Sequence, residues 1–82
     1  MAKSKVLVIE DEPDILEVIQ YNIEREGHKV IACRDGEQGL SRIRTDAPDL
    51  VILDLMLPGM DGTEVCRQVK ADPVTRGIPI IM

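Results

Sequence analysis

The sequence predicts an α/β fold with a doubly wound parallel sheet, in which helices cover both faces. Short apolar runs rich in β-branched residues alternate along the chain with segments whose apolar residues recur at helical spacing. The predicted order is strand–helix–strand–helix–strand–helix–strand, and strands that alternate with helices are joined by crossovers that make them parallel. A length of 82 residues fits one domain.

The first strand is predicted at residues 5–9, a continuous apolar run of the kind that is buried on both faces of a sheet. A helix of about three turns follows, because Pro13 is well tolerated in a first helical turn and Gly27 favours a helix end. Its apolar residues at helical spacing are Ile15, Leu16, Ile19 and Ile23.

The second strand is predicted at residues 28–33, which are less apolar and fit a place nearer the sheet edge. Asp35 and Gln38 have the spacing of a capping box, so they predict the start of the second helix. The segment 47–49, Ala-Pro-Asp, ends that helix.

The third strand is predicted at residues 50–53, the second strongly apolar run, which ends on Asp54. A loop with two turn formers in succession follows at residues 55–60. Beyond it, capping spacing at Asp61 and Glu64 predicts a third helix with an apolar stripe of Val65, Cys66 and Val69.

After a loop at residues 71–77, the fourth strand begins within residues 78–82. No linker, internal repeat or low-complexity segment interrupts this pattern. The whole chain therefore belongs to one structural unit.

Charge and composition exclude several classes of function. Ten basic and fifteen acidic residues give a net charge of −5, which argues against direct binding to nucleic acid or to an anionic membrane surface. The longest apolar runs are far shorter than the roughly 20 residues of a membrane-spanning helix. No secretory signal opens the chain, so we expect a cytoplasmic protein in which Cys33 and Cys66 are reduced, small apolar core groups.

Acidic residues follow two of the predicted strands at the point where each strand ends. Glu10, Asp11 and Glu12 follow the first strand, and Asp54 follows the third. Ligands of open parallel sheets bind outside the carboxyl ends of the strands. If these two strands are neighbours, at least three carboxylates converge in one cleft, whereas Asp49 lies at the opposite end of the third strand.

Converging carboxylates repel one another unless a cation neutralises them. Oxygen ligands without a nearby cysteine or second histidine favour a hard ion such as Mg²⁺. The alternative is that the acidic run only stabilises the start of a helix through its dipole. That alternative explains Asp14 and Glu12, but it does not explain Asp54, a charge at the end of an apolar strand.

Three stretches of the sequence together resemble the receiver domain of two-component response regulators, and in particular its OmpR/PhoB branch. They are residues 8–13 (Val-Ile-Glu-Asp-Glu-Pro), residues 49–62 (Asp-Leu-Val-Ile-Leu-Asp-Leu-Met-Leu-Pro-Gly-Met-Asp-Gly) and residues 77–82 (Gly-Ile-Pro-Ile-Ile-Met). The resemblance covers the chain in register. It implies a flavodoxin-like fold with strand order 2-1-3-4-5.

The resemblance also implies a phosphorylation switch. Asp54 would be the nucleophile that accepts a phosphoryl group from a phosphohistidine of a sensor histidine kinase. Glu10, Asp11, Asp54 and the backbone carbonyl of Met56 would hold Mg²⁺. The module would be a phosphoacceptor that assists its own phosphorylation and dephosphorylation, with no other enzymatic activity.

The family pattern contains further elements that would lie beyond Met82. They are a Ser or Thr after the fourth strand, a Lys at the end of the fifth, and the helices of a face that mediates dimerisation. We therefore expect residues 1–82 to be the N-terminal two-thirds of a receiver domain, truncated after strand four, without an effector domain. The full-length parent would then be able to form a homodimer and to regulate transcription.

Two alternatives remain open at this point. Without the Ser or Thr and the Lys, the chain would be a phosphorylation-incompetent fragment or a scaffold for interactions. The other is a Mg²⁺-dependent hydrolase of the haloacid-dehalogenase type, which also uses an Asp after a strand. That type needs a second Asp two positions on, where this chain has Met56.

Overall fold

A computed structural model describes residues 4–54 and 56–82 of the chain. It confirms the predicted α/β class, since these residues form a sheet of four parallel strands in the order β2-β1-β3-β4. The elements in chain order are β1 (Lys5–Ile9), α1 (Pro13–Arg25), β2 (Lys29–Cys33), α2 (Gly36–Asp46), β3 (Leu50–Leu53), α3 (Gly62–Ala71) and β4 (Ile80–Ile81).

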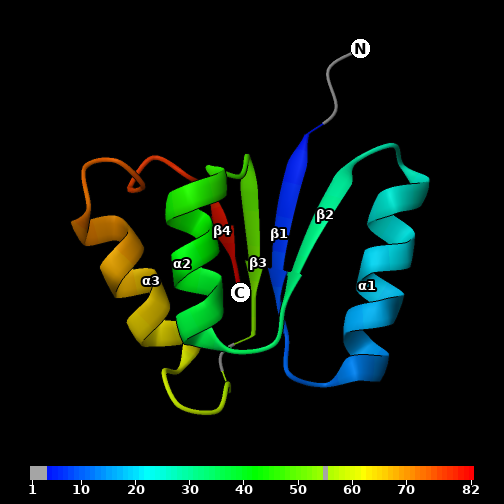
Figure 1. Ribbon diagram of the computed structural model, residues 1–82, viewed down its shortest axis with the longest axis horizontal. Helices are drawn as coiled ribbons and strands as arrows, with labels where there is room; N and C mark the ends of the chain where they lie inside the picture. Colours follow the sequence, from blue (N-terminus) through cyan, green and yellow to red (C-terminus); the bar gives the residue numbers. More distant parts are fainter. Residues whose placement is uncertain (1–3, 55) are drawn as a thin grey trace.

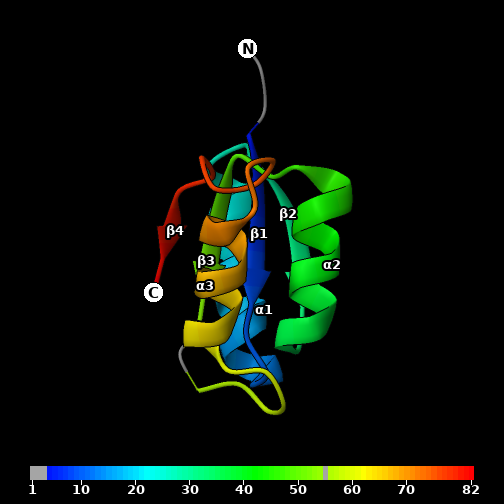
Figure 2. The ribbon, with the colours of Figure 1, turned by 90° about the vertical axis from the view of Figure 1, so that its left-hand side faces the viewer.

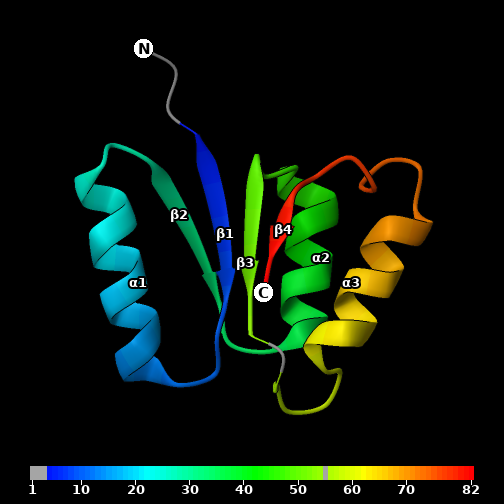
Figure 3. The ribbon, with the colours of Figure 1, turned by 180° about the vertical axis from the view of Figure 1, so that it is seen from behind.

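Helices cover both faces of the sheet, as expected for a doubly wound fold. Figure 1 shows α1 on one face and α2 with α3 on the other, and Figure 3 shows the same layers from behind. Side chains alternate between the two faces along β1: Val6 and Val8 pack with Leu16 of α1, whereas Leu7 and Ile9 join the larger cluster under α2 and α3. Both faces of β1 are therefore buried.

The apolar stripe of α1 is narrower than its sequence pattern suggests. Leu16 is buried, and Ile19 and Ile23 pack against the same cluster. Ile15, which the spacing places beside them, is 48% exposed because it lies on the flank of the stripe.

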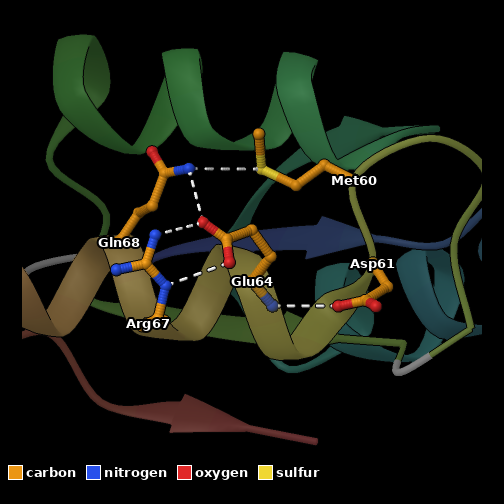
Figure 4. Close-up of polar contacts among 5 residues, drawn as sticks. All are labelled: Met60, Asp61, Glu64, Arg67 and Gln68. Carbon is orange, nitrogen blue, oxygen red and sulfur yellow. Dashed lines mark hydrogen bonds and ion pairs between the residues drawn. The ribbon is translucent and has the colours of Figure 1, made fainter.

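The two predicted capping positions of α2 and α3 are confirmed. The Asp35 carboxylate accepts a hydrogen bond from the Gln38 amide at 2.7 Å. The Asp61 carboxylate accepts one from the Glu64 amide at 2.9 Å (Figure 4). In contrast, Glu12 stands at the N-cap of α1 without a side-chain capping bond.

The strand at the β4 edge is shorter than the sequence pattern indicates (Figure 2). Pairing is confined to Ile80–Ile81, whereas residues 78–82 were expected to enter the strand. Pro79 has no amide hydrogen to donate, although its carbonyl accepts a hydrogen bond from Val51 at 3.0 Å. Similarly, β2 begins at Lys29, one residue later than predicted.

The cysteines fit their predicted place as free thiols at the core. Cys33 is buried and Cys66 is half-buried against the same cluster. Burial raises the pKa of the Cys33 thiol, which keeps it protonated. Within the described part of the chain, no helix combines the length and the apolar character that crossing a membrane requires.

Candidate functional site

Three carboxylates meet at the carboxyl end of the sheet. Glu10 and Asp54 directly follow β1 and β3, which are neighbouring strands with Ile9 opposite Leu53. Glu10, Asp11 and Asp54 each offer a carboxylate oxygen, and these oxygens lie within 4.8 Å of one another. The convergence expected from the strand ends is confirmed.

Backbone hydrogen bonds of the sheet fix two of these residues. The Glu10 amide donates to the Cys33 carbonyl at 3.0 Å, and the Asp54 amide donates to the Ile9 carbonyl at 3.0 Å. Both acids are thus held by the same bonds that join the strands. Their positions follow from the strand register, with no separate loop geometry required.

The electrostatics of the site centre on Glu10, which is only 8% exposed. Burial raises the pKa of the Glu10 carboxyl, and the nearby charges of Asp54 and Asp11 raise it further. A hydrogen bond from the Glu12 amide to Glu10 Oε2, at 3.2 Å, acts in the opposite direction. The net shift shows that the folded protein holds this negative charge at a cost.

A mostly apolar pocket of about 190 Å³ lies beside the acids. Its lining includes Glu10 and Asp54 together with apolar side chains of β1, α1, β3 and the C-terminal residue. These are Val8, Ile9, Ile19, Ile52, Leu53 and Met82.

Oxygen donors in this arrangement fit a small hard cation. The ion pairs of the described residues lie elsewhere, at Arg42–Asp46, Arg44–Asp72 and Arg67–Glu64. A divalent cation would favour the charged form of the buried Glu10 carboxyl and relieve its repulsion from Asp54 and Asp11. The donor set therefore fits Mg²⁺, which is bound through a few carboxylates and water.

A model of the response regulator receiver domain family matches residues 6–82. The chain belongs to this family. Among curated proteins, it is 46% identical over 78 residues to the alkaline phosphatase synthesis transcriptional regulatory protein PhoP of Bacillus subtilis. It is 42% identical over 80 residues to the DNA-binding response regulator MtrA of Mycolicibacterium smegmatis. These relatives agree with the predicted OmpR/PhoB branch.

Solved receiver structures share the fold closely. The N-terminal domain of a response regulator receiver protein from Methanoculleus marisnigri has 39% identity and a TM-score of 0.91, over 96% of this chain and 64% of that one. The receiver domain of the sensor histidine kinase PA1611 from Pseudomonas aeruginosa, with a magnesium ion coordinated in its active-site cleft, has 29% identity and a TM-score of 0.92. That match covers 96% of this chain and 65% of that one.

This receiver chain spans about a third of the curated relatives. The match to PhoP covers 95% of this chain and 32% of PhoP. The match to MtrA covers 98% of this chain and 34% of MtrA. The family match does not favour the alternative of an interaction scaffold.

Glu12 and Asp49, two other acids near these strands, lie outside the cluster. Glu12 is exposed and contributes its backbone amide to Glu10, with its side chain pointing to no capping partner. Asp49 lies at the amino end of β3, where Oδ2 accepts a hydrogen bond from the Lys5 amide at 2.7 Å. It does not join the cluster.

Met56 lies two residues after Asp54 and is 83% exposed. Its amide donates to Asp54 Oδ1 at 3.2 Å, which orients the Asp54 carboxylate. The role of the Met56 carbonyl as a metal ligand stays a prediction. Leu55, between these two, lies outside the described residues.

Arg34 is a residue of the site region that the sequence pattern did not single out. Its Nη2 donates to the Asp11 carbonyl at 3.3 Å. The segments that leave β1, β2 and β3 emerge at the same end of the sheet (Figure 1), and Arg34 immediately follows β2. A basic residue directly after a neighbouring strand was the signal that could have identified it.

Proposed function

We propose that the chain is the phosphoacceptor part of a response regulator, with Asp54 as the residue that is phosphorylated in a Mg²⁺-dependent transfer. The donor is a phosphohistidine of a sensor histidine kinase. One observation carries the proposal: Asp54 stands at the end of β3 with its carboxylate beside those of Glu10 and Asp11.

The transfer is a substitution at phosphorus. An Asp54 carboxylate oxygen forms the new O–P bond while the N–P bond of the phosphohistidine breaks, and the electron pair of that bond returns to the imidazole. The backbone bond from Asp54 to Ile9 holds the nucleophile against the sheet. The Met56 amide engages Oδ1, which limits rotation of the carboxylate.

Glu10, Asp11, Asp54 and the Met56 carbonyl are the proposed ligands of Mg²⁺. When bound, the ion offsets negative charge among the carboxylates and on the transferring phosphoryl oxygens. The position of Glu10 supports this assignment, because burial and then the nearby charges of Asp54 and Asp11 raise the pKa of its carboxyl, and a bound cation would offset both effects. The magnesium ion in the Pseudomonas receiver domain also supports it.

We infer that residues 1–82 correspond to the N-terminal two-thirds of a receiver domain, consistent with the 64% and 65% coverage of the solved receivers. The whole protein would act in the cytoplasm as a regulator of transcription, like the proteins named above. Homodimerisation would belong to the whole protein, and this segment, with its net charge of −5, would not bind nucleic acid directly. It would be a signalling module rather than a classical enzyme.

Intact-protein mass spectrometry tests the assignment of Asp54. The protein is incubated with Mg²⁺ and acetyl phosphate, and one phosphoryl group should be gained and mapped to Asp54. Asp54→Asn should abolish the gain, whereas the matched control Asp49→Asn, at the other end of the same strand, should retain it. Phosphorylation of the Asp54→Asn protein at another residue would overturn the proposal.

A further inference from the structure

Asp11 is held differently from the other two acids of the site. Glu10 and Asp54 are fixed by backbone bonds of the sheet, but Asp11 lies two residues beyond Ile9, the last paired residue of β1. Within residues 4–54 and 56–82, its one hydrogen bond is the bond that its carbonyl accepts from Arg34 Nη2 at 3.3 Å. A contact between residues 23 positions apart thus holds the loop that carries the acid.

The peptide group that joins Asp11 to Glu12 takes part in two hydrogen bonds at once. Its carbonyl accepts from Arg34, and its amide donates to Glu10 Oε2 at 3.2 Å. Because a peptide group is planar, fixing the direction of the carbonyl also fixes the direction of the amide. Arg34 is therefore linked through one rigid group to the buried Glu10 carboxylate.

Hydrogen bonds hold the backbone of Arg34 in place. Its amide donates to Gln38 Oε1 at 3.1 Å, while the Gln38 amide donates to Asp35 Oδ1 at 2.7 Å. Gln38, three residues after the N-cap Asp35, thus bonds both the N-cap side chain and the Arg34 amide that precedes it. The preceding residue, Cys33, accepts the backbone bond from Glu10. The exposed guanidinium thus extends from a fixed point at the end of β2.

The contact of Arg34 is with a carbonyl oxygen, so the guanidinium forms no ion pair with the acids. The ion pairs of the described residues all lie on other side chains. The three carboxylates consequently keep their charge available for a cation. Arg34 therefore orients the loop without neutralising the carboxylates.

We propose that Arg34 is a positioning residue of the site. By holding the Asp11–Glu12 peptide, it directs the Glu12 amide at Glu10 and sets the place of the Asp11 carboxylate. Its role in metal binding rests on the proposed function, since it acts on two of the proposed Mg²⁺ ligands. The orientation of the peptide is a property of the metal-free protein and can be measured without the ion.

The first measurement is hydrogen exchange of the Glu12 amide by NMR in metal-free protein. Arg34→Ala should accelerate this exchange roughly three- to tenfold, as expected for the loss of support from one hydrogen bond. Arg34→Lys, which keeps a charged donor, should retain most of the protection. The matched control Arg42→Ala removes an equal charge from an exposed position on α2 and should leave the Glu12 amide unchanged.

The second measurement is the Mg²⁺ dissociation constant by calorimetric titration. Arg34→Ala should raise it roughly tenfold, the scale on which outer contacts to metal ligands act, and Arg34→Lys should restore most of the affinity. Thermal unfolding of each variant verifies that the fold is retained. Equal behaviour of Arg34→Ala and Arg42→Ala in the amide exchange would overturn the proposal.

The two proposals fail separately. A Glu12 amide that responds to Arg34→Ala in a protein whose Asp54 takes no phosphoryl group would support the positioning role and refute the proposed function. Phosphorylation of Asp54, together with a Glu12 amide whose exchange does not change in Arg34→Ala, would support the proposed function and refute the positioning role.

Discussion

The two ends of the sheet use the same residue type in opposite ways. At the amino end, the Asp49 carboxylate accepts a hydrogen bond from the Lys5 amide, and the Asp49 amide donates to the Lys5 carbonyl at 2.8 Å. The Lys5 ammonium also donates to the Asp46 carbonyl. At the carboxyl end, Glu10, Asp11 and Asp54 face one another.

This difference separates a structural carboxylate from a ligand-binding one. A carboxylate that meets a backbone amide gains a charge-assisted hydrogen bond and stabilises the joining of two segments. A carboxylate that meets other carboxylates costs free energy until a cation arrives. Sites of function are where proteins retain such unfavourable groups.

The largest expected effect is the loss of metal-dependent stabilisation at the carboxyl end. Mg²⁺ at a hundredfold excess over its dissociation constant should stabilise the protein by about 2.7 kcal/mol, because the folded state alone assembles the site. Asp11→Asn should abolish most of this gain, since it removes one of the three converging carboxylates. Urea unfolding with and without Mg²⁺ measures the gain.

Asp49→Asn is the matched control for that experiment, because it makes the same chemical change at the amino end. It should lower stability with and without Mg²⁺ alike and leave the metal-dependent gain intact. If both variants lost the gain equally, the carboxylates at the two ends of the sheet would not differ in metal binding.

The next effect concerns the packing on which the carboxyl end rests. Gly39 of α2 lies against Ile9, the residue before Glu10, and a Cβ at Gly39 would meet Ile9 Cδ1 and would lie 2.6 Å from Ile9 Cγ1. Gly39→Ala should therefore destabilise the protein by about 1–3 kcal/mol through overpacking. The free energy of unfolding in urea measures this change.

Gly77→Ala provides the comparison, since nothing lies within 4 Å of its added Cβ. It should change stability by less than about 0.5 kcal/mol. A Gly39→Ala protein as stable as the Gly77→Ala protein would show that α2 can move away from Ile9 at little cost.

Local signals explain which parts of the fold could be predicted. The strand of residues 5–9 is recognisable because its apolar run is short and rich in β-branched residues, as in a strand buried on both faces. The caps at Asp35 and Asp61 depend on residues three positions apart, so the sequence contains both partners. Convergence of Glu10 with Asp54 follows once β1 and β3 are neighbours.

Contacts that depend on the reach of a side chain could not be predicted in this way. Arg34 meets the loop at Asp11 only because β1 and β2 are paired in the register that places both at the same end. The close approach of Gly39 to Ile9 depends on how α2 lies on the sheet. The exposure of Ile15 likewise depends on how α1 lies on the sheet.

The smallest expected effect is that two carboxyl groups change the free energy of unfolding in opposite directions as the pH changes. In Figure 4, Glu64 of α3 contacts Arg67 and Gln68, and hydrogen bonds from these two lower its pKa from 4.5 to about 2. Its stabilising contribution is therefore present above pH 4.5 and is lost as the pH falls toward 2. Glu64 is exposed, so solvent screening keeps this contribution small.

Glu10 should have the opposite dependence in metal-free protein. Burial raises its pKa above 4.5, so the folded state binds the proton more tightly than the unfolded chain, and stability falls as the pH rises through the folded-state value. Urea unfolding in the presence of a chelator measures the stability of Glu10→Gln and Glu64→Gln relative to the unsubstituted protein. As the pH rises above 4.5, Glu10→Gln should gain relative stability. As the pH rises from about 2 to 4.5, Glu64→Gln should lose it. Profiles of the same sign would contradict the distinction, because a carboxylate satisfied by donors and one confined among other acids must respond to protons in opposite directions.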